Sequence, residues 1–248
     1  DIGLAASMNI PWLQVRRQPR VAIIATGDEI VMPGDPLGPN QIISSNSLAL
    51  EAFVRVLGGM PVNLGIARDT KESLCDTLSR ARGADALVTI GGASVGEYDL
   101  VRQVMGAEGL KLNFYKVAMR PGKPLIFGNW NEIPVLGLPG NPVSAGVTSA
   151  IFLRSAMEIM LGTGDGRMVT EMVRLGRDLP KNGKREDFMR AKLDIDANGQ
   201  LYATPFKHQD SAMMAVFAQS DCLLLRAPNA RTARKGDLVS IIRLDGGI

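Results

Sequence analysis

Short β-branched runs alternate with segments of helical periodicity from residue 21 to about residue 162, and this alternation limits the fold more than any other feature of the chain. Strands and helices that alternate over such a length build a parallel sheet covered by helices on both faces. The predicted strands are residues 21–25, 62–67, 86–90, 112–117, 125–127 and 135–138. We therefore predict an α/β fold with a mostly parallel sheet.

Helices are predicted between these strands from apolar spacing and from residues that start or stop a helix. Leu50, Phe53, Val54 and Leu57 recur at the spacing of one helical face, and two glycines end that helix. The others are a helix capped by Thr70, a short one over 98–105, and a long one capped by Asn141, opened by Pro142 and ended by Gly162. Ligands of such sheets bind beyond the carboxyl ends of the strands, so the residues after each strand are the first functional candidates.

The pattern changes after residue 162, where residues 162–166 form a glycine-rich joint. Short strands separated by turn signals follow, which is typical of a small all-β, barrel-like domain. The predicted strands there are 168–175, 188–196, 201–204, 222–226 and 238–244. The expected domains are 1–18, a linker or remnant of a preceding domain, 19–163, the α/β domain, and 164–248, the C-terminal β domain.

Composition narrows the possible chemistry. A net charge of +3 suits an anionic ligand, but with 5% aromatic residues it falls short of a nucleic-acid footprint. One histidine, His208, and two cysteines, Cys75 and Cys222, exclude a His-rich zinc site, a CxxC pair and a Cys/His dyad within the chain. We interpret both cysteines as core thiols. Chemistry must then rely on carboxylates, hydroxyls, Lys, Arg and backbone amides.

Neither a membrane anchor nor a secretion signal is expected. Gly, Pro, Asn or charge interrupts each apolar run before the ~18 residues that a membrane span needs. The sequence has no signal-peptide pattern, and its cysteine usage fits a reducing compartment, so we expect a cytoplasmic protein. The chain begins with Asp1 instead of Met, and we expect it to be the later part of a longer protein.

Carboxylates follow three of the predicted strands, in Thr26-Gly27-Asp28-Glu29, in Arg68-Asp69, and in the segment from Gly91 to Asp99. The carboxyl ends of parallel strands share one edge of the sheet, so these groups are expected to converge on one crevice. Beside an anionic ligand they would hold Mg²⁺, which takes few carboxylates and keeps waters and phosphate oxygens. The alternative for each motif alone is an ordinary turn or cap.

Two glycine-containing loops and one basic turn are candidates for anion binding. Gly91-Gly92-x-Ser94 and Leu138-Pro139-Gly140-Asn141-Pro142-Val143-Ser144 each lead from a strand to the N-terminus of a helix, where unpaired N–H groups attract anions. Met119-Arg120-Pro121-Gly122-Lys123-Pro124 holds two cations on a stiff turn, which favours oxyanion recognition. The alternative for each glycine-containing loop is a rigid connection without a ligand. The alternative for the basic turn is a solvated surface loop.

Polar clusters at 184–190 and 208–211 stand out in the β domain, but composition alone makes both ordinary surface. By the same reasoning His208 is expected to be a structural hydrogen-bonding residue.

Taken together, these motifs resemble the molybdopterin molybdenumtransferase family, which comprises the MoeA proteins and the gephyrin E domain. The resemblance runs from about residue 19 to residue 248 and follows the motifs ending in Glu29, Asp99, Pro124 and Ser144 in order. Members carry two further domains upstream. The resemblance implies insertion of molybdate into adenylated molybdopterin with release of AMP, dependent on Mg²⁺. Molybdenum would be held by the dithiolene sulfurs of the substrate.

The resemblance also implies roles for residues of this chain. Glu29, Asp69 and Asp99 match the essential carboxylates, which the resemblance implies are also the Mg²⁺ ligands. The expected molybdate-binding residues are Arg120, Lys123, Pro124, Arg185 and Ser211. The expected substrate-binding residues are Thr26, Gly27, Asp28, Gly91, Gly92, Ser94, Pro139, Gly140, Asn141, Pro142 and Ser144. The chain departs from the family pattern at Thr70, where a second acid is common, at Arg120, which replaces a common lysine, and at Asp210 beside Ser211.

Two other functions stay open at this point. A molybdopterin adenylyltransferase would share the α/β fold but lack the β domain. A catalytically silent molybdopterin-binding or scaffolding module would keep the fold, although the intact set of carboxylates favours the enzyme. By resemblance we also expect a homodimer and a contact with a molybdopterin adenylyltransferase, and no nucleic-acid or membrane partner.

Overall fold

The computed structural model describes residues 1–91 and 103–244. Its first large sheet has six strands in the order β4-β1-β5-β9-β8-β6. Their bounds are β1 Arg20–Thr26, β4 Met60–Ala67, β5 Ala86–Ile90, β6 Leu110–Tyr115, β8 Ile126–Trp130 and β9 Ile133–Leu138. The four strands β4, β1, β5 and β9 are parallel, and β8 and β6 are antiparallel to their neighbours. The predicted mostly parallel sheet is confirmed.

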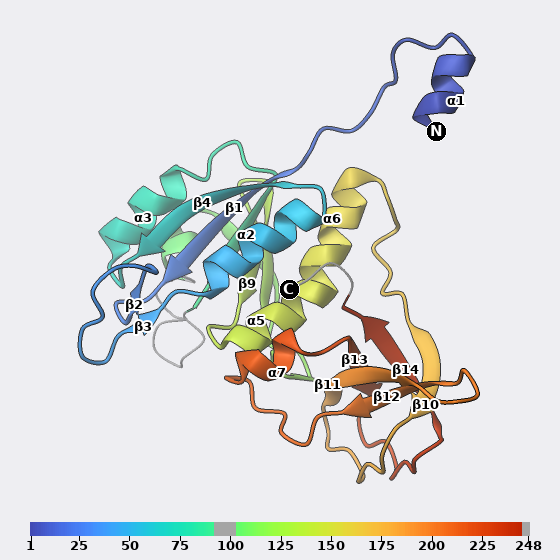
Figure 1. Cartoon of the computed structure of the whole chain (residues 1–248). Helices are drawn as coiled ribbons and strands as arrows, with labels where there is room; N and C mark the ends of the chain where they lie inside the picture. Colours follow the sequence, from blue (N-terminus) through green and yellow to red (C-terminus); the bar gives the residue numbers. More distant parts are fainter. Residues whose placement is uncertain (92–102, 245–248) are drawn as a thin grey trace.

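Helices cover both faces of this sheet (Figure 1). Val21 and Ile23 of β1 pack in a cluster with α2 (Asn46–Val56) and with the long helix that follows β9. Ala22 and Ile24 point the other way, into a cluster with α3 (Lys71–Ser79) and the helical residues 103–107. Because alternate residues of a strand face opposite sides, burial on both faces requires an uninterrupted apolar run. The run at residues 21–25 has this property.

The N-cap predicted at Thr70 is present, with its side chain accepting a hydrogen bond from the Ser73 amide at 3.2 Å. The helix predicted over 98–105 lies partly outside the described residues.

The long helix predicted from Pro142 is continuous to Leu161, but it changes pitch on the way. It consists of α5 (Pro142–Thr148), a π-helical segment η1 (Ser149–Leu153) and α6 (Arg154–Leu161), and Gly162 ends it in the left-handed conformation with φ of 70°. This helix is long and apolar enough by composition to cross a membrane, which the sequence-based expectation did not allow for. In the most apolar 18-residue stretch of this helix, 61% is buried within the protein, as is typical of the core helix of a folded domain.

The second large sheet closes into a small barrel in the order β12-β10-β14-β13-β11, with β11 also paired to β12. The strand bounds are β10 Glu171–Leu175, β11 Glu186–Ile195, β12 Leu201–Pro205, β13 Cys222–Arg226 and β14 Leu238–Arg243. The predicted barrel-like β domain is confirmed. The Cys222 thiol is fully buried in it, and burial raises the pKa of this thiol to about 12. Cys75, by contrast, is only half-buried.

The two domains are joined by more than the chain between them. The short strand β7 (Met119–Arg120) lies in the α/β part of the sequence but pairs with β11 of the barrel. A shared apolar cluster contains Val143 and Val147 of α5 together with Phe188 and Phe217 of the β domain. Phe217 belongs to α7 (Met214–Ala218), and a side chain at Gly146 would overlap its ring. The barrel therefore packs directly on the helix that follows β9.

The N-terminal residues extend away from the body of the α/β domain (Figure 1). They include α1 (Ile2–Ser7), which has no buried residue and was not predicted. Arg16 connects this segment to the end of α6, because its side chain donates hydrogen bonds to the Ile159 and Met160 carbonyls at 3.0 and 3.2 Å.

Candidate functional site

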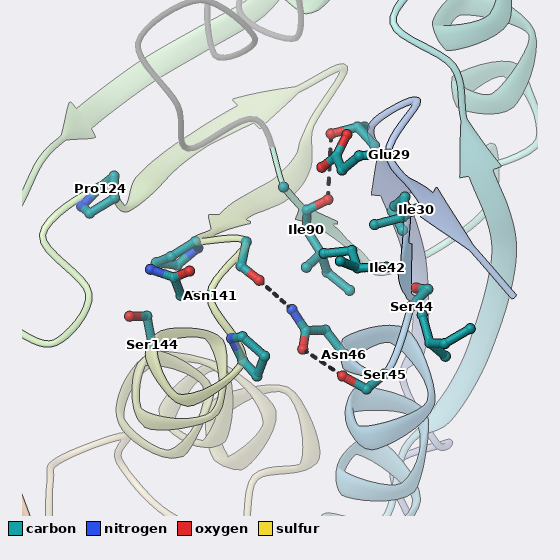
Figure 2. A pocket seen from close by; sticks show the side chains of 17 residues that line it. Glu29, Ile30, Ile42, Ser44, Ser45, Asn46, Ile90, Pro124, Asn141 and Ser144 are labelled. Carbon is teal, nitrogen blue, oxygen red and sulfur yellow. Dashed lines mark hydrogen bonds between the residues drawn. The ribbon is translucent and has the colours of Figure 1, made fainter. Parts of the chain in front are cut away.

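A cavity of about 410 Å³ lies beyond the carboxyl ends of β1, β5 and β9. Figure 2 shows Glu29, Ile42 and Ser44 on one side of it and Asn141 and Ser144 on the other. Ile42 belongs to a two-stranded ribbon of β2 (Ile30–Val31) and β3 (Ile42–Ile43), which was not predicted. The predicted site residues that line the cavity are Thr26, Glu29, Gly91, Pro124, Pro139, Gly140, Asn141, Pro142 and Ser144.

Among the described residues that line the cavity, Glu29 alone carries a carboxylate. Gly27, just before it, has φ of 137°, and a Cβ atom at Gly27 would overlap the Glu29 carboxyl group. The glycine after β1 therefore leaves the room in which the Glu29 carboxylate lies.

Asp28 and Asp69 lie beside each other next to the cavity instead of in its wall. The Asp28 amide donates to Asp69 Oδ2 at 3.3 Å, and the Asp69 amide donates to Asp28 Oδ1 at 3.4 Å. The segments that follow β1 and β4 are thus joined by hydrogen bonds from backbone amides to carboxylates. Asp99, the third member of the predicted set, lies outside the described residues, as do Gly92 and Ser94. Within 1–91 and 103–244, no three His, Cys, Asp or Glu side chains gather as a ready-made metal site.

The floor of the cavity is built from close backbone packing. Gly91 has φ of 101°, and a Cβ atom there would lie 2.5 Å from the Thr26 carbonyl oxygen. A Cβ atom on Gly140 would be 3.5 Å from Gly91 Cα, so the loops after β5 and β9 are in contact. Gly91 is required here because both the positive φ and the close approach exclude a side chain.

Two helices begin at this cavity. Ser45 precedes α2 and Asn141 precedes α5, and neither side chain caps its own helix in the described structure. Asn141 holds the predicted N-cap position of α5, but its side chain makes no cap hydrogen bond, and its Nδ2 donates to Ser211 Oγ at 3.2 Å. Helix N-termini present backbone N–H groups and a partial positive charge, which favour an anion.

Asn46 connects the two helix starts. Its Nδ2 donates to the Gly140 carbonyl at 2.7 Å, across the cavity from α2 to the loop before α5 (Figure 2). Ser44, Ser45 and Asn46 all line the cavity and were missed by sequence analysis. The signal that could have found them is Ser-Ser-Asn directly before an apolar helical pattern, since these residues commonly start helices.

None of the predicted basic residues is among the residues that line the cavity. Lys123 is exposed and Arg185 half-buried, while Pro124 lines the cavity. Arg120 Nε donates to Asp187 Oδ1 at 2.6 Å, and its Nη2 contacts Asp187 Oδ2. The hydrogen bond with the buried Asp187 raises the pKa of Arg120. Arg120 therefore links β7 to the barrel, and a part of its charge is already paired.

Ser211 reaches the cavity rim from the β domain. Besides the contact between its hydroxyl and Asn141, its carbonyl accepts a hydrogen bond from the Val143 amide at 3.2 Å. Ser211 thus meets the first turn of α5, the same turn that carries Ser144 into the cavity. This brings the β-domain residue predicted for oxyanion binding to the helix start predicted for anion binding.

Comparisons with known proteins identify both domains. Residues 22–158 match the family described as a probable molybdopterin binding domain, and residues 172–244 match the MoeA C-terminal region, domain IV. A molybdopterin molybdenumtransferase from Nostoc sp. is 39% identical over 79% of this chain and 46% of its own length. A protein of the same name from Haemophilus influenzae is 31% identical over 97% of this chain and 60% of its own.

Solved structures agree with these sequence matches. The molybdopterin biosynthesis MoeA protein from Pyrococcus horikoshii superimposes with a TM-score of 0.82 at 31% identity, over 97% of this chain and 58% of that protein. The chain spans about half the length of the curated relatives it matches.

Proposed function

Since the chain belongs to the molybdopterin molybdenumtransferase family, we propose that its cavity binds adenylated molybdopterin and that the protein inserts molybdate into this substrate with release of AMP. Molybdenum cofactor would be the other product. The observation that carries this proposal is the meeting of Ser211 with the N-terminus of α5 at the cavity rim. It joins a pocket in the α/β domain to a β-domain side chain that we propose binds the oxyanion.

The cavity suits the substrate in size and polarity. Its volume of about 410 Å³ falls within the roughly 300–1,000 Å³ of small-molecule sites. The starts of α2 and α5 supply backbone N–H groups for phosphate oxygens. Ile30, Ile42 and Ile90 supply apolar wall against which a flat ring system packs.

Carboxylates of this chain would hold a Mg²⁺ ion, and the substrate would supply further oxygen ligands. Glu29 reaches the cavity and Asp69 lies next to the end of β1, while Asp99 is the third proposed ligand. Mg²⁺ binds through one or two carboxylates and keeps waters and substrate phosphate oxygens, so a closed protein cage is not needed. When bound, the ion would neutralise negative charge on the phosphate from which AMP departs.

Molybdate would be held as an oxyanion, without a protein ligand to the metal. Lys123, Arg185 and Ser211 supply N–H and O–H donors of the type that an oxyanion needs. Arg120 would contribute through the guanidinium nitrogen that does not contact Asp187. The molybdenum itself would pass to the sulfurs of the substrate, which explains why a chain with a single histidine suffices.

The alternative functions are less well supported. A molybdopterin adenylyltransferase would not need the β domain, yet residues 172–244 match the MoeA C-terminal region. A silent scaffolding module would not need Glu29 in the cavity wall. Dependence on Mg²⁺, a homodimer, a contact with a molybdopterin adenylyltransferase and a cytoplasmic location remain parts of the proposal.

The test is AMP release from adenylated molybdopterin by the full-length protein, with and without molybdate and Mg²⁺. We expect cofactor formation and AMP release to require both. The Asp99→Asn variant should lose turnover by at least about 10²-fold while its Tm stays near that of the wild type. Near-normal turnover by Asp99→Asn would remove Asp99 from the proposed site, and AMP release indifferent to molybdate would overturn the proposed reaction.

A further inference from the structure

Arg190 is a buried charge that the proposed reaction does not use. It lies on β11 with 1% of its surface exposed. Its Nη2 donates to the Asp210 carbonyl at 2.9 Å, and its Nε has no acceptor among the described residues. Burial lowers the pKa of Arg190, and the negative charge of Asp210 partly offsets this. Burying a guanidinium against a neutral carbonyl is energetically costly.

The position of Arg190 on β11 points its side chain toward the α/β domain. Residues two apart on a strand share a face, so Arg190 lies on the same face as Phe188. Leu223 is its cross-strand partner on β13. Phe188 and Leu223 both belong to the apolar cluster that packs on Val143 and Val147 of α5. Arg190 is therefore at the interface between the domains.

Arg190 also organises the loop that carries Ser211. Its backbone amide donates to Gln209 Oε1 at 2.9 Å, and its carbonyl accepts from Gln209 Nε2 at 2.9 Å. The side chain then holds the Asp210 carbonyl, and Ser211 follows directly. Since Lys207, His208, Asp210 and Ala212 are exposed, little apolar burial fixes this loop. Its place depends on these polar contacts instead.

We propose that Arg190 is a positioning residue: by holding the Asp210 carbonyl it keeps Ser211 against the first turn of α5, at the rim of the cavity. The chain of contacts runs from the Arg190 guanidinium to Asp210, and from Ser211 to Asn141 and Val143. Its consequence for molybdate rests on the proposed function, whereas the placement of Ser211 does not. A lysine keeps the charge but lacks the planar fork of the guanidinium, so Arg190→Lys should loosen the loop without creating a large cavity.

The first experiment measures hydrogen exchange at the Val143 amide, whose acceptor is the Ser211 carbonyl. In Arg190→Lys and Arg190→Met, exchange at Val143 should be faster by about 10-fold or more. Arg226→Met is the matched control, because Arg226 is also buried in the barrel but donates to the Pro180 and Arg231 carbonyls. The proposal is overturned if the Val143 amide exchanges as slowly in Arg190→Lys as in the wild type. It is also overturned if Arg226→Met speeds exchange at Val143 as much as Arg190→Lys does. If Arg190→Met fails to fold, Arg190→Lys alone decides.

The second experiment titrates molybdate against cofactor formation. Arg190→Lys should raise the half-saturating molybdate concentration about 5- to 10-fold, with kcat and affinity for the pterin substrate unchanged. Adding Arg190→Lys to Ser211→Ala should change it no further, because both act on one contact. The role of Arg190 in molybdate binding is overturned if the effects of Arg190→Lys and Ser211→Ala add in the double variant. It is also overturned if Arg190→Lys leaves the half-saturating molybdate concentration unchanged. A wild type without molybdate-dependent turnover instead refutes the proposed function, and the exchange result still decides the placement of Ser211.

Discussion

The two sides of the cavity are built on different principles. The α/β side is assembled mainly from backbone: Gly91 packs on the Thr26 carbonyl and Gly140 packs on Gly91, and the Asn46 side chain holds the Gly140 carbonyl in place. The β-domain side relies more on side chains: Asn141 binds the Ser211 hydroxyl and Arg120 binds Asp187, beside the backbone contact from the Val143 amide to the Ser211 carbonyl.

This difference separates two tasks that one site must perform. A backbone wall keeps its shape when most side chains change, which suits a large substrate bound through its phosphates and ring faces. A side-chain wall sets the local charge and hydrogen-bond donors, which suits a small oxyanion. We therefore expect substitutions on the first side to affect folding and substrate binding, and substitutions on the second to affect mainly the requirement for molybdate.

The largest effect is expected from Gly91→Ala. A methyl group would lie 2.5 Å from the Thr26 carbonyl oxygen at φ of 101°, so either the loop or the end of β1 must move. We expect a loss of at least about 2 kcal/mol in the free energy of unfolding, which is roughly 5 °C or more in Tm. Calorimetry of the purified variant measures this.

Gly83→Ala separates strain from contact in that experiment. Gly83 also has positive φ, at 81°, but a Cβ atom there meets no atom within 4 Å. It should lose only about 1 kcal/mol, the cost of the left-handed conformation alone. Equal losses in the two variants would contradict the close-packed floor of the cavity.

Glu29→Gln should abolish most turnover with little loss of stability. The substitution preserves the size of the side chain and removes its charge in the cavity wall, so we expect AMP release to fall at least about 10²-fold with Tm nearly unchanged. Asp35→Asn is the control, because Asp35 is exposed and does not line the cavity. If the turnover of Glu29→Gln stayed within a few-fold of that of Asp35→Asn, the Glu29 carboxylate would not be needed for the reaction.

Arg120→Ala tests whether the β-domain side depends on side-chain contacts. It would leave Asp187, which is 4% exposed, without its charged partner. We expect about 1–3 kcal/mol of destabilisation, or roughly 3–10 °C in Tm. Arg167→Ala removes a solvent-exposed pair with Asp165 and should change Tm by no more than about 1 °C. The measurement is the Tm of both variants. Equal Tm values for Arg120→Ala and Arg167→Ala would show that the contact between Arg120 and Asp187 does not stabilise the fold.

The smallest effect concerns Asp85, remote from the cavity. Its hydrogen bonds with Arg17, at 2.5 Å, lower the pKa of its carboxyl group, more than burial raises it. A lowered pKa in the folded state contributes stability above the unfolded pKa, and this is lost as the pH falls through the folded value. Asp85→Asn should lower Tm by at most about 3 °C at pH 7, and by progressively less as the pH falls below the ordinary titration range of a carboxyl group. A difference that grew on acidification would contradict this sign.

Sequence reasoning succeeded where a local pattern determines the structure. The bounds of β5 (Ala86–Ile90) match the prediction because an apolar, β-branched run ending in glycines has few alternatives once it is buried on both faces. Gly91 and Pro142 could be identified for the same reason, since their backbone chemistry is local.

It failed where partners are distant in the sequence. β7 has two residues and exists because Met119 and Arg120 pair with Glu186 and Asp187 of the barrel. The Asn46 contact joins residues 94 positions apart. A helical pattern marks the start of α2 but not the loop it will meet, so the contribution of Ser44, Ser45 and Asn46 to the cavity required the structure.

The most direct test of the division between the two sides is a molybdate titration of Arg185→Ala. Arg185 is half-buried at the start of β11, and a charged hydrogen bond to an oxyanion contributes roughly 1.5–3 kcal/mol. We expect the half-saturating molybdate concentration to rise about 10- to 100-fold, with the Kd for the pterin substrate unchanged. Lys184→Ala, its exposed neighbour, should leave both values unchanged. An unchanged half-saturation point, or an equal rise in the Kd for the pterin substrate, would contradict the account.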